Sequence, residues 1–177
     1  MTKTVTIFGS SRVSKDSNDY QNAYELGKLL GKAGFTICNG GYGGIMEATA
    51  RGAKSAGGRT IGIITEIFSR FPNRYIDQTI LEKTLLSRLE KLVEIGDAYI
   101  VLKGATGTLA ELAIVWEYIN KGIMTEKPII VLGNFWLPVI KTLNDELTWE
   151  GLENCTKFVT VVTSPNACVE ILKKKFF

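Results

Sequence analysis

The sequence contains no histidine, and among its 177 residues there are only three cysteines and four prolines. The absence of histidine excludes Ser-His-Asp and Cys-His catalytic systems and most zinc sites. The three cysteines, Cys38, Cys155 and Cys168, show no C-x-x-C spacing. Because Cys38 lies in an apolar, strand-like stretch, we interpret it as a small core residue rather than a ligand. We expect no metal site.

Long apolar runs and a strong charge of one sign are also missing. No run approaches the ~18 apolar residues that a membrane-spanning helix needs, and no apolar signal segment precedes the first predicted strand. The formal net charge is only +3, and the basic residues are scattered apart from the run at 173–175. Nucleic acid is therefore a poor candidate partner. We expect a cytoplasmic protein that binds neither nucleic acid nor membrane.

What the sequence does contain is a regular alternation of strand-like and helical patterns. Short apolar runs predict strands at 4–8, 35–38, 60–64, 97–102, 129–132 and 158–162. Helical spacing of apolar residues predicts helices at 20–33, 45–56, 81–95, 109–121 and 137–147, and one at the C-terminal end. The segment 66–80 gives no clear pattern. The near-continuous apolar strands favour an α/β fold, a Rossmann-like doubly wound parallel sheet with helices on both faces. We expect residues 1–177 to form a single nucleotide-binding domain.

Three strand-to-helix junctions carry unusual chemistry: Gly9-Ser10-Ser11, Asn39 to Gly44, and Lys103 to Thr108. In open parallel sheets such junctions meet at the carboxyl ends of the strands, where helix N-termini bind anions. Glycine allows close approach of the backbone, and hydroxyl groups can donate to phosphate oxygens. The predicted phosphate-binding residues are Gly9, Ser10, Ser11, Gly40, Gly41, Gly44, Gly104, Thr106, Gly107 and Thr108. The alternative is that the glycines only serve tight turns. Neither loop matches a P-loop, and no acidic ribose-binding residue follows as in NAD domains.

The order of these motifs resembles the LOG-like family, long labelled "possible lysine decarboxylases". The resemblance rests on NGGYGGIM (39–46) and KGATGTLAE (103–111), and it extends from IFGSSR (7–12) to the segment 115–132. The family pattern is roughly GGGxxGxM followed by PGGxGTxxE, with an arginine on the intervening helix. The matching residues are Gly40, Gly41, Gly44, Met46, Arg88, Gly104, Gly107, Thr108 and Glu111.

The resemblance implies a Rossmann-like homodimer that hydrolyses the N-glycosidic bond of a nucleoside 5′-monophosphate to a free base and ribose 5-phosphate, without a cofactor. It adds Met46 to the nucleotide-binding residues and makes Arg88 and Glu111 the catalytic pair. Glu111 would stabilise an oxocarbenium-like transition state and activate water, while Arg88 would orient the substrate. The alternative roles are a capping box with Thr108 for Glu111 and a place on the helix surface for Arg88. The expected dimer contacts are the helices near 81–95 and 107–121.

Four positions depart from the family pattern: Asn39, Leu89, Lys103 and Ala105. If position 105 needs positive φ, alanine there would distort the phosphate cradle at a cost of about 1–2 kcal/mol. Lys103 could compensate as an added phosphate partner. These departures give weight to a rival function, a non-catalytic carrier of a nucleotide or of the molybdenum cofactor with the same fold.

Overall fold

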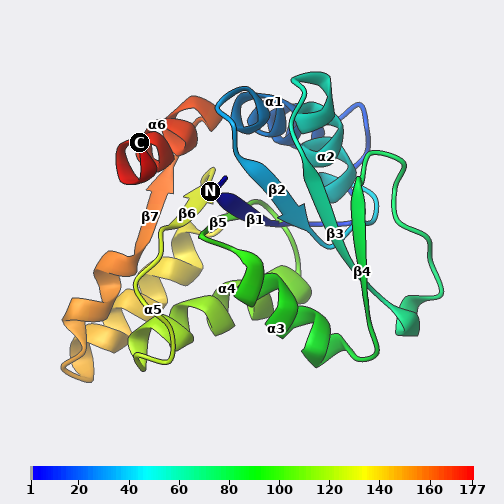
Figure 1. Ribbon diagram of the computed structural model, residues 1–177. Helices are drawn as coiled ribbons and strands as arrows, with labels where there is room; N and C mark the ends of the chain where they lie inside the picture. Colours follow the sequence, from blue (N-terminus) through cyan, green and yellow to red (C-terminus); the bar gives the residue numbers. More distant parts are fainter. Residues whose placement is uncertain (1) are drawn as a thin grey trace.

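The computed structural model describes residues 2–177 as a single α/β domain around one parallel sheet of seven strands. The strand order is β4-β3-β2-β1-β5-β6-β7, and every neighbouring pair is parallel (Figure 1). The strands are β1 (Thr4–Phe8), β2 (Thr36–Asn39), β3 (Thr60–Thr65), β4 (Gln78–Glu82), β5 (Ala98–Val101), β6 (Ile129–Leu132) and β7 (Val159–Val162). The predicted Rossmann-like, doubly wound fold is confirmed.

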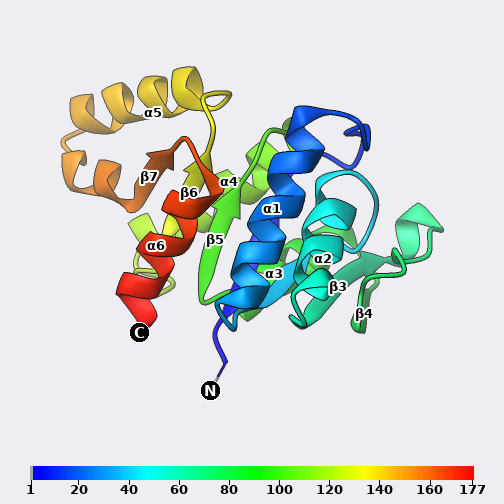
Figure 2. The same cartoon turned by 90° about the horizontal axis from the view of Figure 1, so that it is seen from above.

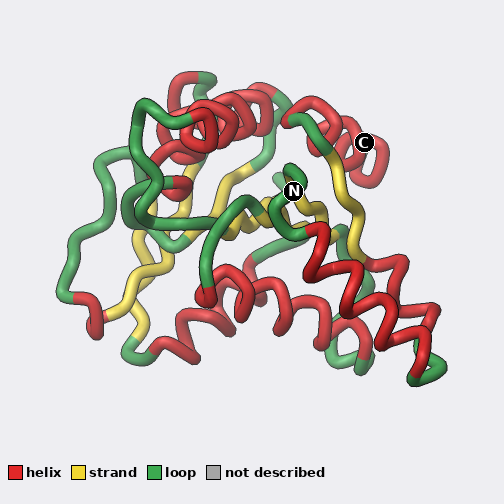
Figure 3. The backbone as a smooth tube through the Cα atoms, turned by 180° about the vertical axis from the view of Figure 1, so that it is seen from behind, coloured by secondary structure: helices red, strands yellow, loops and turns green. Residues whose placement is uncertain are grey.

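Helices cover both faces of the sheet. They are α1 (Asn18–Lys32), α2 (Ile45–Ser55), α3 (Leu85–Ile95), α4 (Thr106–Asn120), α5 (Leu137–Trp149) and α6 (Pro165–Phe176), with short 3-10 helices η1 (Glu66–Phe68) and η2 (Glu153–Phe158). Helices α1, α2 and α6 lie on one face, which Figure 2 shows from above, and α3, α4 and α5 lie on the other (Figure 1). Seen from behind, the strands run between these two helical layers (Figure 3). Each layer has its own apolar core against the sheet.

The central strands explain why the fold could be predicted. All residues of β2, β5 and β6 are buried, as expected for strands with helices on both faces. Side-chain caps then fix where helices begin: Ser17 accepts from the Tyr20 amide at α1, and Ser164 accepts from the Ala167 amide at α6. Within residues 2–177, no helix is both long and apolar enough to cross a membrane.

The structure corrects two element boundaries. Residues 78–82 form the edge strand β4, so the helix predicted from 81 begins only at Leu85, after a capping box between Thr84 and Ser87. The strand lacks a readable apolar run because an edge strand is largely exposed. Helix α4 begins at Thr106 rather than 109. The prediction began too late because the first turn consists of Thr and Gly residues, which are typical of loops.

The chain order places the loops after β1 and β5 side by side. Strand β1 pairs with β2 on one side and with β5 on the other, so successive connections diverge at this point of the sheet. A backbone hydrogen bond from the Ser10 amide to the Lys103 carbonyl (3.1 Å) joins the two loops directly. Ligands of open α/β sheets bind at such a switch point, at the carboxyl ends of the strands.

Candidate functional site

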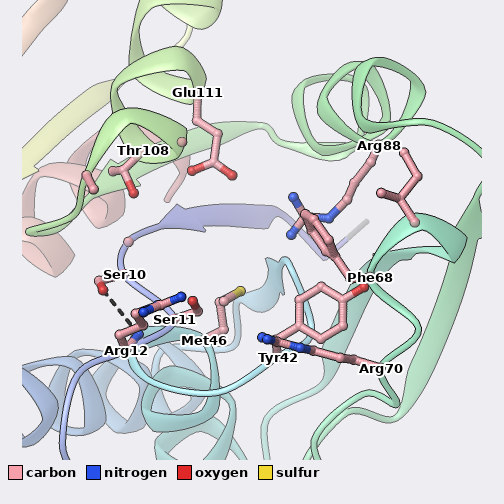
Figure 4. Close-up of a pocket in the computed structure, with 14 residues that line it drawn as sticks. Ser10, Ser11, Arg12, Tyr42, Met46, Phe68, Arg70, Arg88, Thr108 and Glu111 are labelled. Atoms are coloured by element: carbon pink, nitrogen blue, oxygen red, sulfur yellow. Dashed lines mark hydrogen bonds between the residues drawn. The ribbon is translucent and has the colours of Figure 1, made fainter.

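A cavity of about 540 Å³ opens at this switch point, at the carboxyl ends of the strands (Figure 4). Its wall is built from the loops after β1, β2 and β3, from the first turns of α2 and α4, and from one side chain of α3. The lining residues are Gly9, Ser10, Ser11, Arg12, Tyr42, Met46, Ile67, Phe68, Arg70, Arg88, Ala105, Gly107, Thr108 and Glu111. The volume falls within the range of small-molecule sites.

Most of the predicted site residues meet in this one cavity. Those that line it are Gly9, Ser10, Ser11, Met46, Arg88, Gly107, Thr108 and Glu111. Those that do not line it are Gly40, Gly41, Gly44, Gly104 and Thr106. The second group belongs to the same loops, and the glycines in it lie against other parts of the protein. Each glycine loop therefore contributes to the cavity wall partly through residues that lie next to its glycines.

The first glycine loop is held by its own backbone geometry. Gly41 and Gly44 have φ of 79° and 62°, and a Cβ at Gly44 would collide with the Ser10 carbonyl oxygen. Asn39, which departs from the family glycine, is fully buried: its Oδ1 accepts from the Gly41 amide (2.8 Å) and its Nδ2 donates to the Met46 carbonyl (3.0 Å). Asn39 thus closes the loop onto helix α2, and its presence is compatible with a formed site.

The second glycine loop presents the start of helix α4 to the cavity. Ala105 is the N-cap residue, with φ −103° and no side-chain cap on the helix. This φ is negative, so the strain expected from alanine at this position is absent. Nothing lies within 4 Å of a Cβ built on Gly107, which leaves room for a ligand near the backbone. Helix N-termini with unsatisfied amides attract anions, and this one lines the cavity through Ala105, Gly107 and Thr108.

Lys103 does not line this cavity. Its ammonium group lies 3.2 Å from a carboxylate oxygen of Asp19 and 5.8 Å from the centre of the Phe135 ring. These partners border two smaller cavities nearby, which Lys103 also lines. The structure therefore does not place Lys103 as the added phosphate partner that the sequence suggested.

Arg88 is buried, with 8% of its surface exposed, so it is not a surface residue of α3. Its Nε donates to the Ile63 carbonyl (2.7 Å) and a terminal nitrogen donates to the Gly40 carbonyl (3.3 Å). The guanidinium carbon lies 5.7 Å from the centre of the Tyr42 ring. Arg88 therefore joins α3 to strand β3 and to the first glycine loop while one side of it faces the cavity (Figure 4).

Glu111 lies one turn into α4 and points into the cavity (Figure 4). Burial raises the pKa of Glu111 to about 7, and the charge of Arg88 opposes this shift in part. No hydrogen bond or ion pair to another described residue engages its carboxyl group. The suggested capping box is not formed, because Thr108 lies inside the helix and Ala105 is the N-cap. Glu111 is thus a partly buried carboxyl group whose ionisation changes near neutral pH.

Sequence reasoning missed several wall residues: Arg12, Tyr42, Ile67, Phe68 and Arg70. Two of them had a readable signal, because Arg12 directly follows Gly-Ser-Ser and Tyr42 lies inside NGGYGG. The Tyr42 hydroxyl accepts from the Thr65 amide (3.0 Å), and its ring packs edge-on against Phe68 at 5.7 Å. Phe68 and Arg70 belong to the segment that gave no pattern.

Two buried residues show how the core packs around α4. Trp116 on α4 is buried with 3% exposed, and its Nε1 donates to the Cys155 carbonyl (3.1 Å). Cys38 is fully buried in the core against α3 and α4, as expected. In the part of the chain that the structure describes, no three His, Cys, Asp or Glu side chains gather as a metal site.

Three known proteins show what this chain is similar to. An uncharacterized protein of Archaeoglobus fulgidus is 33% identical over 118 residues, which are 67% of this chain and 78% of that protein. The cytokinin riboside 5′-monophosphate phosphoribohydrolase of Mycobacterium tuberculosis is 32% identical over 62% of this chain and 60% of that enzyme. The molybdenum cofactor binding protein of Rippkaea orientalis has a solved structure that matches with a TM-score of 0.79, at 27% identity, over 100% of this chain and 99% of that one.

The resemblance to LOG-like proteins is thus supported at the level of distant relatives. The model of the SLOG cluster4 family matches almost the whole chain, over residues 2–169. The chain belongs to the SLOG cluster4 family.

Proposed function

We propose that this protein hydrolyses the N-glycosidic bond of nucleoside 5′-monophosphates and releases a free base and ribose 5-phosphate. The observation that carries the proposal is the position of Glu111, an unpaired carboxyl group with a raised pKa, in the same cavity as the N-terminus of α4. It lies three positions after Thr108, a rise of about 4.5 Å along the helix. A phosphate at the helix N-terminus would therefore leave the attached sugar within reach of the carboxyl group.

In this proposal the phosphate binds where three features converge. The amides at the start of α4 are free of side-chain caps, Gly107 leaves open space, and Ser10 lines the cavity next to this loop, because its amide donates to the Lys103 carbonyl. The helix dipole and the amides favour a dianion at this point. The aromatic rings of Tyr42 and Phe68 supply an apolar surface for a planar base across the cavity.

Glu111 is the proposed catalytic residue. With a pKa of about 7 it is about half ionised at neutral pH, so it can both accept and donate a proton. The ionised form stabilises positive charge at the anomeric carbon as the bond to the base nitrogen breaks. It then accepts a proton from the water whose oxygen bonds to that carbon and passes this proton to the nitrogen of the departing base, which regenerates the carboxylate. Arg88 acts as a positioning residue, because its donors already hold the carbonyls of Ile63 and Gly40.

The mycobacterial phosphoribohydrolase supports this reaction, since it is 32% identical to this chain. The alignment spans 62% of this chain and 60% of that enzyme. The proposal treats residues 1–177 as one nucleotide-binding domain that needs no cofactor.

The test is a product assay with AMP, GMP, CMP and UMP, in which free base and ribose 5-phosphate are both quantified. We expect equimolar release of the two products from at least one substrate. Ser11→Glu, at an exposed position on the cavity wall, adds a negative charge to the cavity that takes up the phosphate and should reduce kcat/KM by about 10-fold or more. Thr148→Glu on α5 is the matched control, because Thr148 is exposed and lies outside the cavity. No release from any of the four would contradict the proposal.

A second candidate function is a non-catalytic carrier of the molybdenum cofactor or of a nucleotide. The observation that favours it is the full-length match to the Rippkaea orientalis protein, which covers 100% of this chain. The carrier would use the same cavity and the same phosphate site, with Glu111 as a wall residue. Binding of a monophosphate without any release of base would favour the carrier over the hydrolase.

A further inference from the structure

The cavity carries more positive charge than a monophosphate needs. Four of its wall residues carry a guanidinium or carboxyl group: Arg12, Arg70, Arg88 and Glu111. Glu111 is about half ionised near neutral pH, and the N-terminus of α4 adds about half a positive charge. The three guanidinium groups therefore outweigh the roughly two negative charges of one phosphate group.

Two of these arginines are free to bind a ligand. Within residues 2–177, the side chains of Arg12 and Arg70 make no hydrogen bond, ion pair or cation–π contact, whereas Arg88 is held by two backbone carbonyls. Arg12 follows β1 and Arg70 follows η1, so the two side chains come from different loops. In Figure 4 they point toward the middle of the cavity from opposite sides, with Met46 between them.

These two arginines lie apart from the proposed phosphate site. In the same view Thr108 and Glu111 occupy the opposite side of the cavity, on helix α4 (Figure 4). Ser69, which precedes Arg70, has φ 45° and is the only residue other than glycine with positive φ in the described chain. Such a conformation is unfavourable for a serine, and here it occurs between two wall residues, Phe68 and Arg70.

We propose that Arg12 and Arg70 form a second anion subsite, and that the ligand of this cavity is a nucleotide with two phosphate groups. One phosphate binds at the N-terminus of α4. For the position of this first phosphate, the inference rests on the proposed function. The other phosphate binds between the two guanidinium groups, which suit oxyanions because they donate in a planar fork. A 3′,5′-bisphosphate, whose phosphates are separated by the sugar, fits two subsites on opposite sides of the cavity better than a 5′-diphosphate, whose phosphates share one bridging oxygen.

The test compares AMP, ADP and adenosine 3′,5′-bisphosphate by calorimetry on the full chain. The variants are the double variant Arg12→Gln/Arg70→Gln, the conservative double variant Arg12→Lys/Arg70→Lys, and Arg59→Gln as control. Arg59 is an exposed arginine outside the cavity. Thermal melting verifies that each variant folds. We expect all of them to fold, because Arg12 and Arg70 are both exposed.

We expect one of the two doubly phosphorylated probes to bind about 5–30-fold more tightly than AMP at low salt. This gain in affinity over AMP should fall below about threefold in the glutamine double variant. It should recover in part in the lysine double variant and remain unchanged in Arg59→Gln. Equal binding of all three nucleotides, or a gain that survives in the glutamine variant, would overturn the inference. So would an equal loss of AMP and bisphosphate affinity in that variant, because the arginines would then hold the first phosphate. Base release from AMP is measured separately, so a failed hydrolase proposal leaves this comparison interpretable.

Discussion

The guanidinium group of Arg88 donates to the carbonyl of Gly40 across 48 positions of sequence, at 3.3 Å. A second bond, from Nε to the Ile63 carbonyl at 2.7 Å, fixes the other side of the group. The first glycine loop, strand β3 and helix α3 therefore meet at one buried cation. The wall of the cavity on this side depends on that contact.

Gly40→Ala tests this contact. A Cβ at Gly40 would collide with the Arg88 guanidinium group and with the Met46 sulfur, so the variant must displace Arg88 from the Gly40 carbonyl. We expect the free energy of unfolding to fall by about 2–3 kcal/mol in urea denaturation, with weaker nucleotide binding. Gly43→Ala in the same loop is the control, because a Cβ there meets only the Ser11 carbonyl oxygen at 3.5 Å. Equal losses in both variants would show that the Arg88 contact is not the cause.

Glu111→Gln is expected to stabilise the protein, and increasingly so at higher pH. The pKa of Glu111 is about 7 in the folded protein and near 4.5 in the unfolded chain, so the folded state loses stability as pH rises from about 4.5 to 7. Glutamine carries no such cost. Since Glu111 is partly exposed, we expect a gain of about 1–2 kcal/mol at pH 8 and close to none at pH 4.5. Urea denaturation at the two pH values measures this, and a difference that does not change with pH would contradict the raised pKa.

Lys103→Met should leave nucleotide binding unchanged within about twofold. The ammonium group of Lys103 pairs with Asp19, outside the cavity, and an exposed pair of this kind contributes about 0–1 kcal/mol to stability. Calorimetry with AMP is the measurement. A loss of tenfold or more would mean that Lys103 moves to the phosphate when ligand binds.

The dimer expected from the sequence stays a prediction. Leu85 and Leu86 on α3 are 51% and 71% exposed, which gives this helix an uncovered apolar surface. We expect light scattering at micromolar concentration to give the mass of two chains, and Leu86→Glu to give the mass of one. Leu143→Glu on α5, also an exposed leucine, is the control and should remain dimeric. A wild-type monomer would contradict the prediction.

The elements of the fold could be predicted from the sequence wherever a strand is buried, because a buried strand appears as a continuous run of apolar residues. The strands β2, β5 and β6 are fully buried and were all identified, whereas the exposed edge strand β4 was not. For the site, the glycine loops led to Gly107 and Thr108, but the roles of the individual glycines follow from φ angles and close approaches that only the structure shows. Arg70 was out of reach because no periodic pattern marks its loop, and its place in the cavity depends on the path of the chain after β3.

The most direct measurement of the central claim is the steady-state release of base from a nucleoside 5′-monophosphate by wild-type protein and by Glu111→Gln. The exposed Glu117→Gln, further along α4 and outside the cavity, is the matched control. We expect Glu111→Gln to lower kcat by about 10²–10⁴-fold while the Kd for the monophosphate changes little, because the phosphate binds at the helix N-terminus. Glu117→Gln should retain wild-type turnover. Wild-type kcat in Glu111→Gln would contradict the proposed chemistry, even if the protein released base.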